Sequence, residues 1–307
     1  MKILQEGNYL KKVQRYILKK QVCYGARTTS EGEKRQKRLT MMEKILVLGA
    51  SGTVGAAVFR QLSQNDMFDV YGTYFRKESD NPRMRFFSLE NHEQINDLLE
   101  EIAPNIVISA LRGDFQRQME AHALAAEYLR NNQGRMLYFS TVNVFDGNLV
   151  SSHYENDCPE SVSEYGKFKI LCENRLREIL GNQAVILRIP FVYGKNSARM
   201  RQVKNGCEAG TLDVYKNFMC NYVTDVQIAD YVEWILRENK KGIFHIGTTD
   251  AMEYEAFTLR LIKSFGWEYP RLHYMDGAGV MAVLSRREDI PHRLKWNVEN
   301  VIAYLCG

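Results

Sequence analysis

The sequence lacks a long apolar run, and this absence sets the first limit on what the protein does. Nowhere in its 307 residues does an apolar stretch approach the roughly 20 residues that a helix needs to cross a bilayer. A charged segment followed by an apolar one, which marks a secretory signal, is also missing. We therefore expect a protein without a membrane span that works in the cytoplasm.

Cysteine is scarce and scattered. The six cysteines are Cys23, Cys158, Cys172, Cys207, Cys220 and Cys306. No two of them form a CxxC pair, and no histidine stands beside them at metal-ligand spacing. The pattern predicts reduced, mostly structural thiols and no metal site.

An excess of positive charge is missing from most of the chain, although the net charge is +4. Residues 1–40 carry 11 Lys+Arg and 3 Asp+Glu, whereas residues 41–307 carry 30 and 34. The basic character therefore belongs to a leader, and the body is mildly acidic. A nucleic-acid partner has little support from such a body.

The basic leader, residues 1–41, has three interpretations. Apolar residues recur at helical spacing among its lysines, as in a basic amphipathic segment that binds membranes or partners. A transit peptide is conceivable, although Glu31 and Glu33 argue against it. The third interpretation, which we favour, is that translation starts at Met41 or Met42, because the first core strand begins directly after them. We expect the leader to pack poorly.

Short apolar runs alternate with longer amphipathic ones from Lys44 onwards. The runs begin "KILVLG", "GTVGAAVFRQLSQ", "DVYGTYF", "EQINDLLEEI" and continue to "AVILRI". This alternation predicts an α/β fold with a parallel sheet covered on both faces. Beyond it the pattern is mixed, with helices expected at 226–238, 253–265 and about 297–305, and a short strand at "IFHIG".

A glycine-rich turn follows the first expected strand. In "GASGTVG", Gly49, Gly52 and Gly55 stand three apart between a strand and a helix. Glycines let the backbone approach a diphosphate, and the amino end of a helix supplies N–H donors and positive potential. The spacing is GxxGxxG rather than the commoner GxGxxG, but its strand-turn-helix context predicts a dinucleotide site.

The end of the second strand indicates which dinucleotide. An NAD site usually has an acidic residue there, to hold the ribose hydroxyls. In "DVYGTYFRK" the strand ends in Arg76 and Lys77, and Asp69 lies at the other end. Two cations suit a 2′-phosphate, so NADP(H) is preferred and NAD(H) stays open. The alternative is a solvated loop of mixed charge.

The stretch "SEYGKFKIL" holds Tyr165 followed by two lysines. On a helix, residues four apart share a face and residues two apart do not. Lys169, and not Lys167, can therefore stand beside Tyr165. A cation near a phenol stabilises the phenolate and lowers the phenol pKa from about 10.

Two hydroxyl residues, Ser140 and Thr141, follow the strand "RMLYFS". They reach the carboxyl edge of the sheet, where ligands bind in this class of fold. A hydroxyl there can hydrogen-bond a carbonyl under reduction, but Ser/Thr pairs also cap turns. The pair by itself leaves both interpretations open.

The chain contains four segments that occur together in a known family: in order, they are GASGTVG, STVNVF, Tyr165-x-x-x-Lys169 and "LRIPFVYG". It resembles the extended short-chain dehydrogenase/reductase family, and most closely its dTDP-4-dehydrorhamnose reductase-like, sugar-nucleotide-binding branch, over about 43–305. The resemblance implies a Rossmann-type doubly wound parallel sheet at 42–190. A smaller mixed α/β substrate lobe would follow at 191–307, with an element that could return to the sheet.

The resemblance also implies roles for individual residues. Thr141 would hydrogen-bond the substrate carbonyl, Tyr165 would donate the proton, and Lys169 would bind the cofactor ribose and tune the phenol. Arg112, Asn143 and Phe191 would line the substrate site. The cofactor contacts would be Gly49, Ser51, Gly52, Thr53, Val54, Gly55, Arg76, Lys77, Leu89, Ala110, Leu111, Tyr165 and Lys169.

The departures from the family pattern concern the substrate. Val142-Asn143 stands where relatives often have Asp-Tyr and where dehydratases have an acid pair, which disfavours a dehydratase. The fourth strand ends in "SALRG" instead of an Asn-Ala-Ala run, and the carboxyl-terminal sugar-nucleotide signature is not recognisable.

The leading hypothesis is an NADP(H)-dependent reductase of a keto group on a nucleotide-linked sugar. A sugar-nucleotide epimerase and a non-catalytic, dinucleotide-binding regulatory subunit are the alternatives, and a homodimer is left open.

Overall fold

The computed structural model describes residues 42–76, 78–91 and 93–307. The predictions for the leader, Met42 apart, and for Lys77 therefore lie outside the described residues. Seven strands form the central sheet: β1 (Glu43–Leu48), β2 (Phe68–Tyr74), β3 (Met84–Phe86), β4 (Ile106–Ser109), β5 (Arg135–Thr141), β6 (Ala184–Ile189) and β11 (Ile243–His245). Their order is β11-β6-β5-β4-β1-β2-β3, and every neighbouring pair is parallel.

The strand order changes direction between β1 and β4. From β1 the chain continues outwards through β2 and β3, and it then returns to β4 on the other side of β1. The connections that follow β1 and β4 therefore leave the carboxyl edge in opposite directions, and this is where this class of sheet binds its ligand. The predicted doubly wound α/β fold is confirmed.

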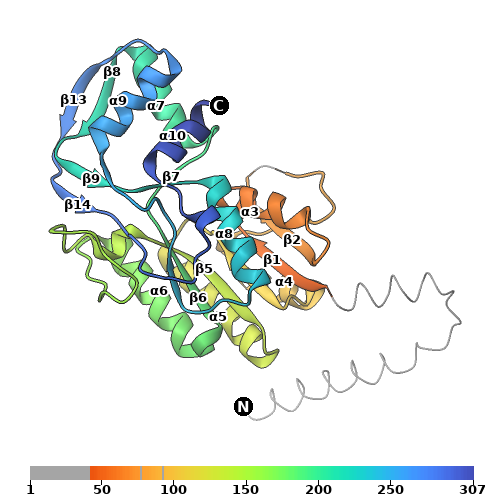
Figure 1. Cartoon of the computed structure of the whole chain (residues 1–307). Coiled ribbons are helices and arrows are strands. Elements are labelled where there is room, and N and C mark those ends of the chain that lie inside the picture. Colours follow the sequence, from red (N-terminus) through yellow and green to blue (C-terminus); the bar gives the residue numbers. More distant parts are fainter. Residues whose placement is uncertain (1–41, 77, 92) are drawn as a thin grey trace, which may run out of the picture. The chain divides into compact units, whose positions relative to one another are not determined.

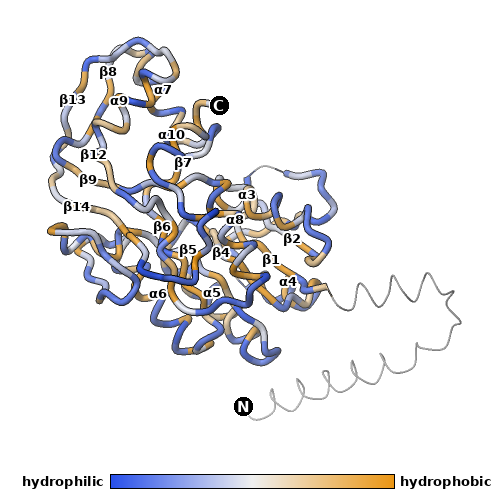
Figure 2. The backbone as a smooth tube through the Cα atoms, in the orientation of Figure 1, coloured by the Kyte–Doolittle hydropathy of each residue, from blue (hydrophilic) through white to orange (hydrophobic). Residues whose placement is uncertain are grey.

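Both faces of the sheet are buried. Along β1, Ile45 and Val47 pack into one apolar layer, while Leu46 and Leu48 pack into the other. Successive side chains of a strand point to opposite faces, so a continuous apolar run fills both layers. Figure 2 shows the same feature as apolar colour along the central strands.

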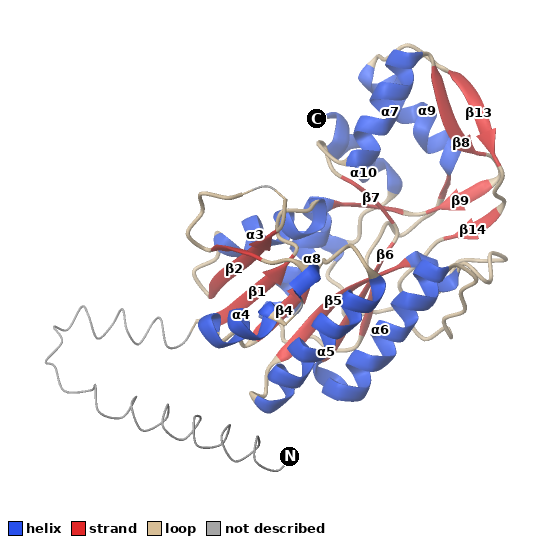
Figure 3. Ribbon diagram, turned by 180° about the vertical axis from the view of Figure 1, so that it is seen from behind, coloured by secondary structure: helices blue, strands red, loops and turns tan. Residues whose placement is uncertain are grey.

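Two layers of helices cover the sheet. One layer contains α3 (Thr53–Ser63) and α8 (Asp225–Arg237), which pack against each other. The other contains α4 (Gln94–Ile102), α5 (Phe115–Asn131) and α6 (Glu164–Leu180). Figure 3 shows α5 and α6 side by side across the sheet.

The central sheet also takes elements from the segment expected to form the substrate lobe. Helix α8 and strand β11 both lie beyond residue 190 in the sequence, yet α8 packs on α3 and β11 pairs with β6. Ile290 and Leu294 add to the same apolar layer. The sequence analysis allowed for an element beyond residue 190 that returns to the sheet, and α8 and β11 are such elements. The domain boundary at 190/191 stays a prediction.

The remaining elements surround a second apolar core (Figure 1). They are β7 (Phe191–Tyr193), α7 (Ala198–Ala209), β8 (Thr211–Tyr215), β9 (Phe218–Cys220), β10 (Tyr222–Thr224), β12 (Met252–Glu253), α9 (Tyr254–Phe265), β13 (Arg271–Met275), β14 (Gly279–Met281) and α10 (Val298–Cys306). Aromatic rings dominate this core, and the rings of Tyr222 and Phe257 stack with centroids 3.7 Å apart.

The helices predicted near 226–238, 253–265 and 297–305, and the strand at "IFHIG", correspond to α8, α9, α10 and β11. The sequence analysis named no strand at β3, because three residues are too few to show a periodicity. Short 3₁₀ helices also lay outside the prediction: η1 (Leu89–Asn91), η2 (Val142–Phe145), η3 (Gly181–Gln183) and η4 (His292–Leu294). Within the described residues, none of the helices has the length and apolar character to cross a membrane.

Candidate active site

A cavity of about 780 Å³ opens at the carboxyl ends of the central strands. Its walls come from the segments after β1, β4, β5 and β6, together with α6 and α7. Most residues that the sequence predicts for the site line it: Gly52, Thr53, Val54, Gly55, Ala110, Leu111, Arg112, Thr141, Asn143, Tyr165, Lys169 and Phe191.

Among the described residues, four that the sequence predicts for the site are not in the wall of this cavity. Gly49 and Ser51 belong to the glycine turn behind it, and the Gly49 N–H donates to the Thr73 hydroxyl at 2.9 Å. Leu89 packs against the apolar layer of α4 and α5. Arg76 is exposed just beyond the end of β2.

The three glycines of the turn serve different purposes. Gly49 has φ +79°, and a Cβ there would lie 2.8 Å from the Ala110 carbonyl oxygen. A Cβ on Gly55 would lie 2.2 Å from the Gly49 carbonyl oxygen, so both positions need glycine for the turn itself. At Gly52 the nearest atom would be 3.5 Å away. Packing within the protein does not require glycine there, which is consistent with a position kept open for a ligand.

Helix α3 begins at this turn without a side-chain cap. The N–H groups of the first turn of a helix have no partner inside the helix. Together with the helix dipole they form a site for an anion. The turn and the helix start therefore fit the diphosphate of a dinucleotide.

The two lysines of α6, Lys167 and Lys169, lie on different faces of the helix, as their spacing from Tyr165 predicts. The Lys169 side chain is buried, lies 5.8 Å from the centre of the Tyr165 ring, and donates from Nζ to the Phe139 carbonyl at 2.9 Å. Lys167 is exposed and pairs with Glu164 at 3.1 Å. Lys169 alone of the two lines the cavity.

The start of α6 is tightly fixed against β5. Ser163 caps the helix by accepting from the Gly166 N–H at 3.1 Å, and the Asp146 carboxylate accepts from the Ser161 and Ser163 hydroxyls. A Cβ on Gly166 would lie 2.2 Å from the Asn143 carbonyl oxygen. This close approach sets the distance between Tyr165, one residue earlier, and the Thr141 segment.

The electrostatics around Tyr165 differ from the expectation. The Tyr165 residue is 40% exposed, and the partial burial of its phenol raises the phenol pKa, while the Arg112 guanidinium and the Thr141 hydroxyl act in the opposite direction. The sequence predicts that Lys169 lowers this pKa. Burial also lowers the pKa of Lys169 itself, to about 8, and Arg112 contributes to that decrease. Arg112 is thus the cation that acts on both groups.

The two hydroxyl residues after β5 have different partners. Thr141 Oγ1 donates to Asn143 Oδ1 at 2.9 Å, and Thr141 lines the cavity. Ser140 donates to the buried carboxylate of Glu173, which also holds Arg188 through bonds of 3.1 and 2.7 Å. Both residues line the cavity, but the Ser140 hydroxyl is bonded into a buried network with an ion pair. The Thr141 hydroxyl is bonded to its neighbour Asn143 and not to that network, so it is the one that can turn to a ligand.

The sequence analysis missed one wall of the cavity. Arg199 and Gln202 reach it from α7, and the Arg199 guanidinium lies over the Phe191 ring, 4.6 Å from its centre. Among the described residues none forms an ion pair or hydrogen bond with the Arg199 side chain. The segment "NSARMRQVKNG" carries no motif, so nothing local in the sequence indicates this role.

The cavity wall is cationic. Arg112, Lys169 and Arg199 line it, and none of its described lining residues is Asp or Glu. A concave surface with charges of one sign concentrates ligands of the opposite sign. The site therefore suits an anionic ligand. In the part of the chain that the structure describes, His, Cys, Asp and Glu form no group of three that could hold a metal ion.

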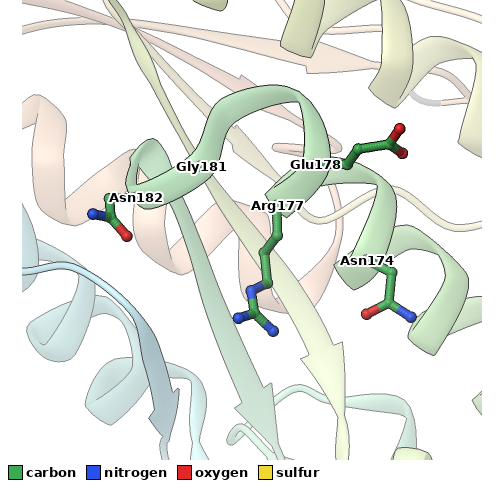
Figure 4. Close-up of a pocket in the computed structure, with 5 residues that line it drawn as sticks. All are labelled: Asn174, Arg177, Glu178, Gly181 and Asn182. Carbon is green, nitrogen blue, oxygen red and sulfur yellow. The ribbon is translucent and has the colours of Figure 1, made fainter.

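A second hollow, of about 390 Å³, lies at the other end of α6 (Figure 4). It is lined by Asn174, Arg177, Glu178, Gly181 and Asn182. It is open to solvent and contains none of the predicted site residues. The larger cavity, which contains most of them, is therefore the candidate active site.

The chain is similar in sequence to known proteins. A family model described as RmlD substrate binding domain matches residues 42–286. "Methionine adenosyltransferase 2 subunit beta" of Danio rerio is 26% identical over 249 residues, which cover 74% of this chain and 75% of that protein. "Probable low-salt glycan biosynthesis reductase Agl14" of Haloferax volcanii is 24% identical, and the match covers 83% of this chain and 90% of that protein.

A solved structure shares the fold. The dTDP-4-dehydrorhamnose reductase of Bacillus anthracis, in complex with NADP, superposes with a TM-score of 0.67 at 17% identity. The match covers 86% of this chain and 99% of that one.

Proposed function

Because the chain belongs to the RmlD substrate binding domain family, we propose that it is an NADP(H)-dependent reductase of a keto group on a nucleotide-linked sugar. The observation that carries the proposal is the meeting of Thr141, Tyr165 and Lys169 at one cavity that also contains the glycine turn. This residue set matches the one that the family resemblance implies for carbonyl reduction.

The protein's own residues would hold the cofactor as follows. The first turn of α3 and Gly52 would bind the diphosphate, and Lys169 would bind a ribose hydroxyl. Arg76, exposed beyond β2, would bind the 2′-phosphate that distinguishes NADP(H). Bound NADPH supplies the hydride.

The carbonyl oxygen of the substrate would lie between Thr141 and Tyr165. Thr141 can orient it by a hydrogen bond when its hydroxyl proton turns from Asn143 Oδ1 to the carbonyl oxygen, and Tyr165 can donate the proton. Because burial raises the pKa of Tyr165, the phenol holds its proton at neutral pH. It is therefore in the form that an acid needs for reduction.

A nucleotide-linked substrate is supported by the second wall. Arg199 is a half-buried guanidinium with no counter-charge among the described residues, and it lies over Phe191. Guanidinium groups bind phosphate oxygens in pairs. We assign Arg199 to the substrate diphosphate. A dehydratase has less support, since the described lining of the cavity offers no carboxylate.

A second candidate comes from a different class. Several relatives carry the name "Methionine adenosyltransferase 2 subunit beta", which favours a dinucleotide-binding subunit of another enzyme. The cavity with Thr141, Tyr165 and Lys169 favours catalysis, because a subunit that only binds a partner has no need of a proton donor.

The test is a screen for NADPH oxidation by the purified protein against nucleotide-linked 4-keto sugars, with NADH run in parallel. Turnover with NADPH on at least one sugar is the expected result. If NADPH binds and no sugar is turned over, the subunit function would replace the reductase.

A further inference from the structure

Arg112 is an exposed cation in the lining of the candidate active site, and the described residues give its side chain no ion-pair or hydrogen-bond partner. It follows β4 by three residues and lines the cavity together with Tyr165 and Lys169. The acidic residue nearest in sequence, Asp114, caps α5 by accepting from the Arg117 N–H at 2.9 Å. None of the described residues forms an ion pair or hydrogen bond with the Arg112 guanidinium.

Arg112 and Lys169 are two cations near one another, and the carboxylate that acts on Lys169, Glu173, is already bonded to Ser140 and Arg188. Arg112 and Lys169 repel each other, which is one reason that the pKa of Lys169 lies below its ordinary value. Beside them, Gln118 is buried in the cavity wall, donates from Nε2 to the Gly113 carbonyl at 2.8 Å, and has no partner at Oε1. This corner of the cavity therefore presents to a ligand an exposed guanidinium and a buried acceptor, Gln118 Oε1, that is without a partner among the described residues.

The other anions of the proposed ligands already have sites. The cofactor diphosphate fits the start of α3, and Arg76 lies beyond β2 where a 2′-phosphate would be. Arg199 belongs to the opposite wall, over Phe191, and suits the substrate diphosphate. Arg112 remains, and it stands where the reacting part of the substrate must be, beside the proton donor.

We propose that Arg112 binds a carboxylate on the sugar itself, so that the substrate class is a nucleotide-linked uronic acid. The inference rests on the proposed function and narrows its substrate. A guanidinium forms two parallel hydrogen bonds with a carboxylate, which an ammonium group does not.

The carboxylate would also affect the chemistry. Arg112 lowers the pKa of the Tyr165 phenol, and an anion bound to Arg112 neutralises that influence. The phenol pKa then rises, so Tyr165 keeps its proton to higher pH when a uronate is bound. A substrate with the carboxylate would thus stabilise the acid form of its own proton donor.

The experiment measures the binding of two stable ligands in the presence of saturating NADP⁺. UDP-glucuronate and UDP-glucose differ in a carboxylate and a hydroxymethyl group on the same carbon. Titration by calorimetry gives the ratio of their dissociation constants. The variants are Arg112→Gln, Arg112→Lys, Arg199→Gln and, as a control, Arg117→Gln, which replaces an exposed arginine on α5 outside the cavity wall.

The unmutated protein should bind UDP-glucuronate about ten- to a hundredfold more tightly, since a hydrogen bond between charged groups contributes that much. Arg112→Gln should bring the ratio close to one and leave NADPH binding unchanged, while Arg112→Lys should retain part of it. Arg117→Gln should keep the full ratio. Arg199→Gln should weaken both ligands by the same factor.

Three results would overturn the inference. The first is equal affinity of the unmutated protein for the two ligands, and the second is an unchanged ratio in Arg112→Gln. The third is a loss of NADPH affinity in Arg112→Gln, which would assign the guanidinium to the cofactor. In these cases the proposed reductase would stand. If neither ligand binds at all, with UDP or with dTDP as the nucleotide, the proposed substrate class fails and this inference fails with it.

Discussion

The cavity has two walls that are built in different ways. On the reaction wall, formed by Thr141, Tyr165 and Lys169, the polar groups already have partners inside the protein, and the Tyr165 phenol is influenced by a hydrogen bond with Thr141. Thr141 donates to Asn143 and Lys169 donates to the Phe139 carbonyl. On the recognition wall, formed by Phe191, Arg199 and Gln202, the guanidinium rests on an aromatic ring and has no counter-charge among the described residues.

This difference separates two requirements of an enzyme. Groups that take part in chemistry must be held in place before the substrate arrives, because reorganisation during the reaction raises the barrier. Groups that recognise a substrate can leave their charges for the ligand to satisfy. Arg112 resembles the recognition wall in lacking a partner, although it stands beside the reaction wall.

We expect the largest effect at Tyr165, because its hydroxyl is assigned to proton transfer. Tyr165→Phe removes that hydroxyl and keeps the ring that packs near Phe115. The rate should fall by about 10² to 10⁴ while NADPH affinity barely changes. Steady-state kinetics on a substrate from the screen, with fluorescence titration of NADPH, would measure both. Full activity in this variant would remove the reductase mechanism.

The buried network behind the reaction wall should matter for stability. Glu173→Gln leaves the buried Arg188 guanidinium without its carboxylate. Losing one partner of a buried pair is expected to destabilise the fold by about 3 to 5 kcal/mol, which lowers Tm by roughly 6 to 20 °C in a domain of this size.

The control is on the same helix. Glu178→Gln removes a carboxylate that pairs with the exposed Arg175, and it should change the free energy of unfolding by less than about 1 kcal/mol. The double variant Glu173→Gln/Arg188→Met should recover part of the lost stability, because no unpaired charge is then buried. Similar Tm losses in the two Glu variants would show that the network does not stiffen this wall.

The buried lysine gives the reaction wall a pH dependence. The pKa of Lys169 is about 8 in the fold and 10.5 ordinarily. Between these values the unfolded chain binds one more proton, so the stability contributed by this group rises with pH. Relative to Lys169→Met, the unmutated protein should therefore gain roughly 3 kcal/mol from pH 8 to 10.5. Urea unfolding at several pH values measures the difference.

Lys167→Met is the matched control, because Lys167 is exposed and lies only two residues away. Its stability difference from the unmutated protein should not depend on pH. An equal pH dependence for the two lysine variants would contradict the burial of Lys169.

The fold was predictable where the pattern is local. The run Ile45–Leu48 is apolar at every position and is buried on both faces of the sheet, as such a run predicts. The packing partner of α8 could not be predicted from such a local pattern. Its apolar face indicates that it packs on something, but periodicity does not say whether that partner is α3 or the aromatic core beyond β6.

The site shows the same division. The glycine turn and the Tyr165–Lys169 pair follow from spacing along one strand or helix. Spacing alone left open whether Ser140 and Thr141 bind a ligand or cap a turn, and only the family resemblance named Thr141. The partner of Ser140, Glu173, lies 33 residues away in the chain, so no local pattern indicates it. Arg199 could not be found either, since its place in the cavity depends on the packing of α7 and not on a motif.

The smallest expected effect lies outside both walls, at the exposed Arg76 beyond the end of β2. We predict that the protein prefers NADPH over NADH and that Arg76→Ala weakens NADPH binding by about tenfold. The effect should be modest, because an exposed guanidinium is screened by water and salt. NADH affinity should stay the same, since NADH has no 2′-phosphate. Raising the salt concentration should reduce the preference in the unmutated protein and leave Arg76→Ala almost unaffected. Fluorescence titration of both cofactors gives all four affinities at each salt concentration. Equal affinity of the unmutated protein for NADPH and NADH would remove the basis for the proposed cofactor, while both walls of the cavity would keep their assignments.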